Sequence, residues 1–97
     1  SHTSEIVVGD DVNINLGCVL VAVERIAIGR NTSIAEYVSI RDQSHKFQPG
    51  VGVRGLGFDV APVEIGENVW IGRGAFIGQG TVIGANSIVG ANSVVHG

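Results

Sequence analysis

The chain has 97 residues, which suits one domain, and a formal net charge of −3, which gives no basic surface for nucleic acid or an anionic membrane. Almost all of its apolar residues are Val, Ile, Leu and Ala, which favour strands, and no apolar run reaches the roughly 18 residues of a membrane span. The polar start shows no signal peptide and the single cysteine excludes an internal disulfide, so we expect a cytoplasmic protein.

An aliphatic residue, which we call the anchor, returns every sixth position along most of the chain. The anchors are Val8, Ile14 and Leu20, then, after a two-residue slip, Ile28, Ile34 and Ile40, and later Ile65, Ile71, Ile77, Ile83, Val89 and Val95. A period of six fits neither an amphipathic helix nor the two-residue alternation of an ordinary strand. It predicts a solenoid in which one short strand and one turn make each repeat.

Two further positions of each hexad are selective. Four residues after the anchor, small side chains dominate, so we expect anchor and small residue both to point into a narrow interior, with Cys18 as a packed thiol. Three residues after the anchor stand types that tolerate a left-handed backbone at a tight corner. These are Asp11, Gly17, Asn31, Asn68, Gly74, Gly80, Asn86 and Asn92. Tyr37 falls at the same corner position, where we expect it to be exposed or at an interface.

Three hexads make one triangular coil of eighteen residues. The pattern predicts a single all-β domain over residues 1–97, a parallel β-helix of about four coils. The coils span about residues 8–26, 28–45 and 65–82, and a fourth begins at Ile83 and stops in mid-pattern at Gly97. Neither end shows a cap over its strand edges, which indicates a minimal or truncated version of the fold.

The repeat fails at length only once, over residues 46–62, KFQPGVGVRGLGFDVAP. Its prolines and glycines exclude a regular helix. Loops longer than about 12–15 residues are uncommon in compact domains and are often functional. The segment is also too apolar for a free linker, so we expect this excursion loop to leave the column and pack on a neighbouring chain.

Two motifs flank the excursion, VSIRDQSHKF from Val38 to Phe47 and APVEIGENVWIGRG from Ala61 to Gly74. With the hexads, they resemble the hexapeptide-repeat acyltransferases, in particular the sugar and polysaccharide O-acetyltransferase branch. The resemblance implies a left-handed β-helix, although the general rule for parallel crossovers favours right-handed connections. It also implies a homotrimer that binds acetyl-CoA, as co-substrate, between its subunits.

The resemblance implies that His45 is the catalytic base, because the family's catalytic histidine falls at this place in the motif. Acetyl transfer to a hydroxyl needs a base within hydrogen-bond reach, and an imidazole changes charge near neutral pH. Asp42, three residues earlier, is a second catalytic candidate: it holds the imidazole, contacts the acceptor, or is a simple turn carboxylate. Ser44 falls at a small inward position, so we expect it to pack rather than to act as a nucleophile.

Five residues are candidates for binding the co-substrate. The tryptophan of V-W-I-G is implied to lie near the active site and the cofactor, and Arg73 and Ala91 fall where the family offers backbone groups to the pantetheine arm. Two glycines would let that arm approach closely, although corner geometry explains them equally well. The five are Trp70, Gly72, Arg73, Gly90 and Ala91. Arg54, in the excursion, contacts the CoA phosphates, contacts an acidic acceptor, or is a solvated side chain.

Other functions use the same fold. A γ-type carbonic anhydrase needs three histidines around a metal, but the chain has only His2, His45 and His96, two of them at its ends, so we reject this function and expect no metal. The short chain favours a non-catalytic trimeric assembly module, whereas the D-x-x-H motif argues against it. The acceptor is a sugar or glycan hydroxyl if the resemblance holds, and an amine or antibiotic is the alternative.

Overall fold

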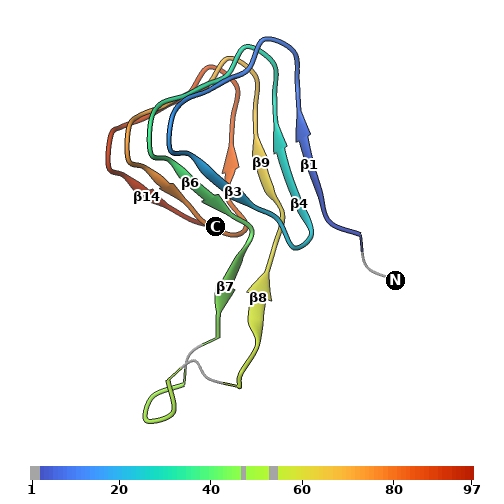
Figure 1. Cartoon of the computed structure of the whole chain (residues 1–97), viewed down its shortest axis with the longest axis vertical. Helices are drawn as coiled ribbons and strands as arrows, with labels where there is room; N and C mark the ends of the chain where they lie inside the picture. The colour runs from blue at the N-terminus through green and yellow to red at the C-terminus, as the bar shows by residue number, and fades with distance from the viewer. Residues whose placement is uncertain (1–2, 47, 53–54) are drawn as a thin grey trace.

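The chain winds into a left-handed parallel β-helix, as predicted, with the shape of a triangular column (Figure 1). The computed structural model describes residues 3–46, 48–52 and 55–97, and it contains no helix within these ranges. Three parallel sheets form the sides of the column. Their strands are β1 (Glu5–Val8), β4 (Arg25–Ile28), β9 (Val63–Ile65) and β12 (Val82–Ile83); β2 (Asn13–Ile14), β5 (Ser33–Ile34), β10 (Trp70–Ile71) and β13 (Ile88–Val89); and β3 (Val19–Val21), β6 (Ser39–Arg41), β11 (Phe76–Ile77) and β14 (Val94–Val95).

The coils stack with anchor above anchor, which is the register that the repeat predicts. Ile14 pairs with Ile34, Ile34 with Ile71, and Ile71 with Val89. The first step is 20 residues because of the slip, the second is 37 because of the excursion, and the third is the 18 of an uninterrupted coil. The strands are short because the backbone turns a corner after every few residues.

Each predicted corner residue has a left-handed backbone, so this prediction is confirmed. The φ angles lie between 55° and 75° at the eight Asp, Asn and Gly positions named above, and Tyr37 has a φ of 59°. Above the first coil, backbone hydrogen bonds join the corners to the coil beneath, for example from Tyr37 N to Leu16 O and from Asn68 N to Arg30 O, both at 2.9 Å. Asn68 Nδ2 also donates to Asn86 Oδ1 at 2.6 Å, so the amide side chains form part of the stack.

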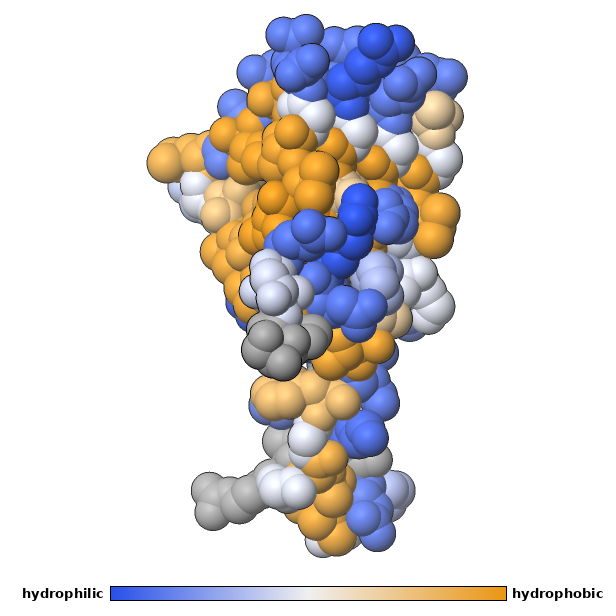
Figure 2. All heavy atoms as spheres, turned by 90° about the vertical axis from the view of Figure 1, so that its right-hand side faces the viewer, coloured by the Kyte–Doolittle hydropathy of each residue, from blue (hydrophilic) through white to orange (hydrophobic). Residues whose placement is uncertain are grey.

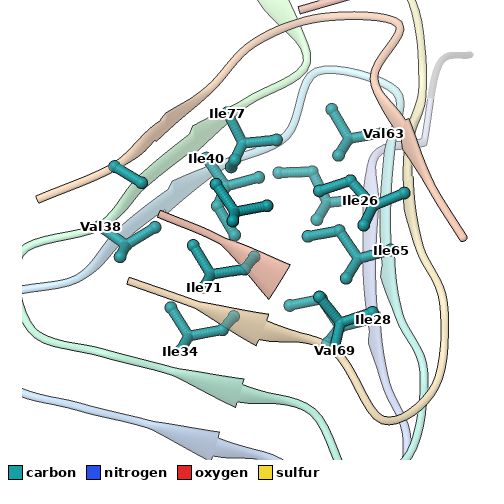
Figure 3. Close-up of a cluster of buried hydrophobic side chains, with 13 residues drawn as sticks. Ile26, Ile28, Ile34, Val38, Ile40, Val63, Ile65, Val69, Ile71 and Ile77 are labelled. Carbon is teal, nitrogen blue, oxygen red and sulfur yellow. The ribbon is translucent and has the colours of Figure 1, made fainter. Parts of the chain in front are cut away.

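Inward-facing isoleucine and valine side chains fill the column in layers (Figure 3). The middle coils supply the fully buried anchors Ile34, Ile40, Ile71 and Ile77. Burial of each such side chain stabilises the fold by about 1.5–3 kcal/mol. The buried small positions are Thr32, Val38, Val69, Ala75 and Thr81. The prediction that both positions of the hexad point inward is therefore confirmed for these coils.

The glycine that follows many anchors is required by the closeness of the next coil. A Cβ atom at Gly29 would lie 2.5 Å from the carbonyl carbon of Gly66, and one at Gly72 would lie 2.5 Å from Ala91 N. No side chain fits in that space. Coil stacking thus accounts for these glycines without any ligand.

The excursion is a β-hairpin that projects from one corner of the column (Figure 1). Its antiparallel strands are β7 (Gln43–His45) and β8 (Phe58–Val60), and Ala61 N donates to Asp42 O at 3.0 Å to close its base. The chain therefore leaves the column after Asp42, three residues before the predicted start of the excursion. The expectation that Ser44 packs inward is wrong, because Ser44 belongs to the hairpin and is exposed.

Apolar side chains also lie on the outside of the column. Figure 2 shows an apolar area on the side of β1, between a hydrophilic upper corner and a hydrophilic patch nearer the hairpin. In the last coil, Val82, Ile88 and Val94 point outward from the three sheets with exposed fractions of 75%, 74% and 69%. Exposed aliphatic residues on every side of one coil are typical of a surface that another molecule covers.

Candidate active site

The hairpin holds His45 beside the sheet that contains β6. His45 pairs with Phe58 across the hairpin, and their ring centroids are 4.6 Å apart. Lys46 N donates to Gly57 O at 3.0 Å, which continues the antiparallel pairing past His45. The histidine side chain is exposed, so it is accessible to a substrate.

Two adjoining cavities lie at this corner, and we call them together the groove. One, of about 370 Å³, is lined by Arg41, Gln43, Ser44, His45, Phe58 and Phe76. The other, of about 250 Å³, is lined by Gln43, Ser44, Phe76, Gly78, Gln79 and His96. The shared residues make the groove continuous from His45 to His96. Figure 1 agrees, since the C-terminus lies beside the base of the hairpin.

Asp42 is fully buried at the base of the hairpin. Its Oδ1 accepts a hydrogen bond from Val23 N at 2.8 Å, and its Oδ2 accepts from Glu24 N at 2.7 Å and from Arg25 N at 2.8 Å. The carboxylate thus sits in a nest of three backbone N–H groups and fixes the two-residue slip of the coil beneath. These contacts are those of a structural turn carboxylate. The assignment of Asp42 as a catalytic residue stays a prediction.

Trp70 lies on another side of the column from His45. It points outward from β10, between Ser33 and Ile88, with 48% of its surface exposed. Arg73 is at the next corner, where its guanidinium carbon lies 5.5 Å from the centroid of the Tyr37 ring. This cation–π contact gives Tyr37 a partner. Tyr37 is 53% exposed, which agrees with the first of the two expected alternatives, an exposed corner residue.

The remaining cofactor candidates follow Trp70 up the same edge. Ala91 is exposed and stacks directly above Gly72, while a Cβ atom at Gly90 would meet only Ser93 Oγ, at 3.5 Å. In the part of the chain that the structure describes, none of the five candidates lines the groove. The structure thus brings these five together along one edge and His45 to another, and their binding of a co-substrate stays a prediction.

The other residues and sites considered from the sequence lie away from the groove or outside the described residues. Arg54, His2 and Phe47 are outside the described residues. Cys18 packs against the core as expected, and its Sγ donates to Ala35 O at 3.0 Å. Over residues 3–46, 48–52 and 55–97, no cluster of His, Cys, Asp and Glu could hold a metal ion, and no helix could cross a membrane.

Sequence reasoning missed most of the groove. Gln43, Gln79 and His96 reach it from the hairpin and the last two coils. Gln43 lies within the motif from Val38 to Phe47 but had no predicted role, and Gln79 and His96 belong to neither motif. The signal that could have found Gln79 and His96 is their coil position, because residues one coil apart lie one above the other. Gly97 N donates to Gln79 O at 2.9 Å, which is this stacking at the groove.

Residues 62–97 match the family described as bacterial transferase hexapeptide (six repeats). Among solved structures, the chain is similar to a maltose O-acetyltransferase from Clostridium difficile 630, with 40% identity and a TM-score of 0.83 over 93% of this chain and 48% of that one. It is also similar to a hexapeptide-repeat acetyltransferase of Vibrio cholerae O1 biovar eltor in complex with acetyl coenzyme A, with 26% identity and a TM-score of 0.76 over 95% of this chain and 55% of that one. The chain thus spans about half the length of each. No curated protein matches it.

Proposed function

Because the chain belongs to the hexapeptide-repeat transferases, we propose that it forms the catalytic part of an acetyl-CoA-dependent O-acetyltransferase. The observation that carries this proposal is the place of His45, an exposed imidazole on a hairpin that opens onto a groove. Both similar structures are acetyltransferases by their descriptions, and one holds acetyl coenzyme A. The acceptor is a hydroxyl compound that occupies the groove.

The reaction is a direct transfer. His45 takes the proton from the acceptor hydroxyl while the hydroxyl oxygen attacks the thioester carbonyl of acetyl-CoA. Backbone N–H groups stabilise the oxyanion, the bond from carbon to sulfur breaks, and the CoA thiolate leaves and takes the proton that His45 removed from the hydroxyl. General-base help of this kind contributes roughly 10²–10⁴-fold to the rate. The rest comes from holding the two substrates together.

The working unit in this proposal is a homotrimer whose active sites lie between subunits. His45 and the five cofactor candidates occupy different edges of one chain, and closed cyclic symmetry brings unlike edges of neighbouring chains together. The exposed Trp70 and the outward aliphatic residues of the last coil support an interface on these surfaces. The hairpin would then reach across to the neighbouring subunit.

Replacing His45 tests the proposal. We expect His45→Ala to lower kcat by roughly 10²–10⁴-fold with acetyl-CoA and an accepted hydroxyl compound, because the proton on the attacking hydroxyl loses its acceptor. Turnover is measured by release of free CoA thiol. Lys46→Ala is the matched control, since the side chain of Lys46 is exposed on the same strand extension. Undiminished turnover in His45→Ala would refute the assignment of the base.

A further inference from the structure

Two amide side chains of the groove have unused hydrogen-bond acceptors. Gln43 Oε1 and Gln79 Oε1 are shielded from solvent and have no hydrogen-bond partner among the described residues. The only other such atom in the described part of the chain is Arg25 Nε, which still lies 3.5 Å from a carboxylate oxygen of Glu64. A shielded acceptor without a donor costs about 1–3 kcal/mol, so a rotation of either amide that turns its oxygen toward a ligand O–H group in the groove is favoured.

The described lining of the groove contains basic side chains and no acidic one. Its titratable lining residues are Arg41, His45 and His96, and no carboxylate belongs to the described lining although the chain carries a net charge of −3. The nearby Asp42 is buried with both oxygens bound. Asp59 pairs with Ser44 across the hairpin but does not line either cavity.

Arg41 is the fixed positive charge in this lining. Its Nε donates to Ser39 Oγ at 3.3 Å, and no acidic partner is found for it in the described residues. A guanidinium that faces a cavity with only a hydroxyl partner suits a carboxylate or phosphate group of a ligand. An ammonium group in the same place would meet a like charge.

We propose that the groove selects a hydroxylated acceptor that carries an acidic group, with Arg41 pairing with the acid and Gln43 and Gln79 accepting hydrogen bonds from hydroxyls. The inference rests on the proposed function, because His45 then meets a further hydroxyl of the same molecule. Phe76, which lines both cavities, offers its ring as an apolar surface for the carbon skeleton.

Three sugars with the same ring but a negative, neutral or positive substituent test this selection. Binding of glucuronate, glucose and glucosamine is measured by calorimetry at neutral pH without acetyl-CoA, so a failure of acetyl transfer does not affect the result. We expect glucuronate to bind at least fivefold more tightly than glucose, and glucosamine to bind most weakly. Equal binding of glucosamine and glucuronate, or binding of none of the three, would overturn the proposal.

Variants locate the two kinds of contact. Arg41→Gln should remove the advantage of glucuronate over glucose, and Gln79→Met should weaken both sugars by roughly fivefold, about 1 kcal/mol. Gln48→Met, at the exposed tip of the hairpin, is the matched control and should change the affinity for neither sugar.

The acid bound by Arg41 could instead be a phosphate of the co-substrate, so CoA is titrated in parallel. An Arg41→Gln variant that loses CoA affinity and keeps the preference for glucuronate would contradict the assignment.

Discussion

At the scale of single residues, Asp42 shows how one side chain can serve two parts of the fold. Its backbone carbonyl accepts from Ala61 at the base of the hairpin, and its carboxylate binds the three N–H groups of the slip. The hairpin that carries His45 is thus tied to the coil beneath it through a buried anion. Hydrogen bonds to charged groups contribute about 1.5–3 kcal/mol each.

Asp42→Asn should therefore lower the free energy of unfolding by about 2–4 kcal/mol, because an amide removes the charge and turns an N–H donor toward backbone donors. The unfolding midpoint in urea measures the change. Asp59→Asn, an exposed residue of the same hairpin, is the control and should stay within about 0.5 kcal/mol of the native chain. An unaltered midpoint together with lost turnover would favour the catalytic assignment of Asp42 instead.

At the scale of elements, the corner formed by Gly17, Tyr37, Gly74 and Asn92 combines backbone strain with side-chain packing. The Tyr37 ring lies where a side chain at Gly17 would stand, and Arg73 lies against the same ring. A tyrosine with a φ of 59° is unusual. The position is tolerated because the corner beneath it carries no side chain.

Gly17→Ala should destabilise the fold by about 3 kcal/mol, of which roughly 1–2 kcal/mol is the left-handed backbone and the rest is overlap with the Tyr37 ring. Gly80→Ala is a matched variant: Gly80 also has a positive φ, of 70°, but its added Cβ would lie at an ordinary 3.5 Å from Ala61 Cβ. We expect that variant to lose only about 1 kcal/mol. Equal losses in thermal unfolding would show that the ring does not matter, and adding Tyr37→Asn to Gly17→Ala should restore part of the stability.

The repetitive elements could be predicted from the sequence because each coil repeats the same local requirements. Asn31, Asn68 and Asn86 mark one corner through backbone preference alone, and the isoleucines mark the interior. The exit of the chain at Asp42 could not be predicted in this way. Ser44 continues the small-residue pattern, whereas the contact that ends the coil joins Asp42 to residues 17–19 positions earlier. For the same reason the motif pointed to His45 but not to Gln79 or His96.

At the scale of the whole molecule, the proposed site requires two chains. His45 projects from one edge of the column, and Trp70 and Arg73 lie along another, so a single chain offers either the proposed base or the proposed co-substrate contacts at a given edge. Light scattering should give the mass of a trimer at micromolar concentration. A stable monomer would contradict this arrangement of the site.

Mixing two impaired variants tests the sharing directly. When His45→Ala and Trp70→Ala chains are unfolded together in equal amounts and refolded, about one quarter of the interfaces should combine an intact histidine with an intact tryptophan. Turnover should recover toward that fraction of the native rate. No recovery above the separate variants would place both residues in sites made by one chain.

The closed base of the hairpin has a consequence for how such a protein can diversify. Because Asp42 and Ala61 are joined by a hydrogen bond across the exit, the coils above and below stay in step whatever length of chain lies between them. Mutation, insertion or grafting in the hairpin can therefore change that segment without rebuilding the scaffold. The hairpin of the proposed site is thus open to change, by evolution or by engineering, at this one junction.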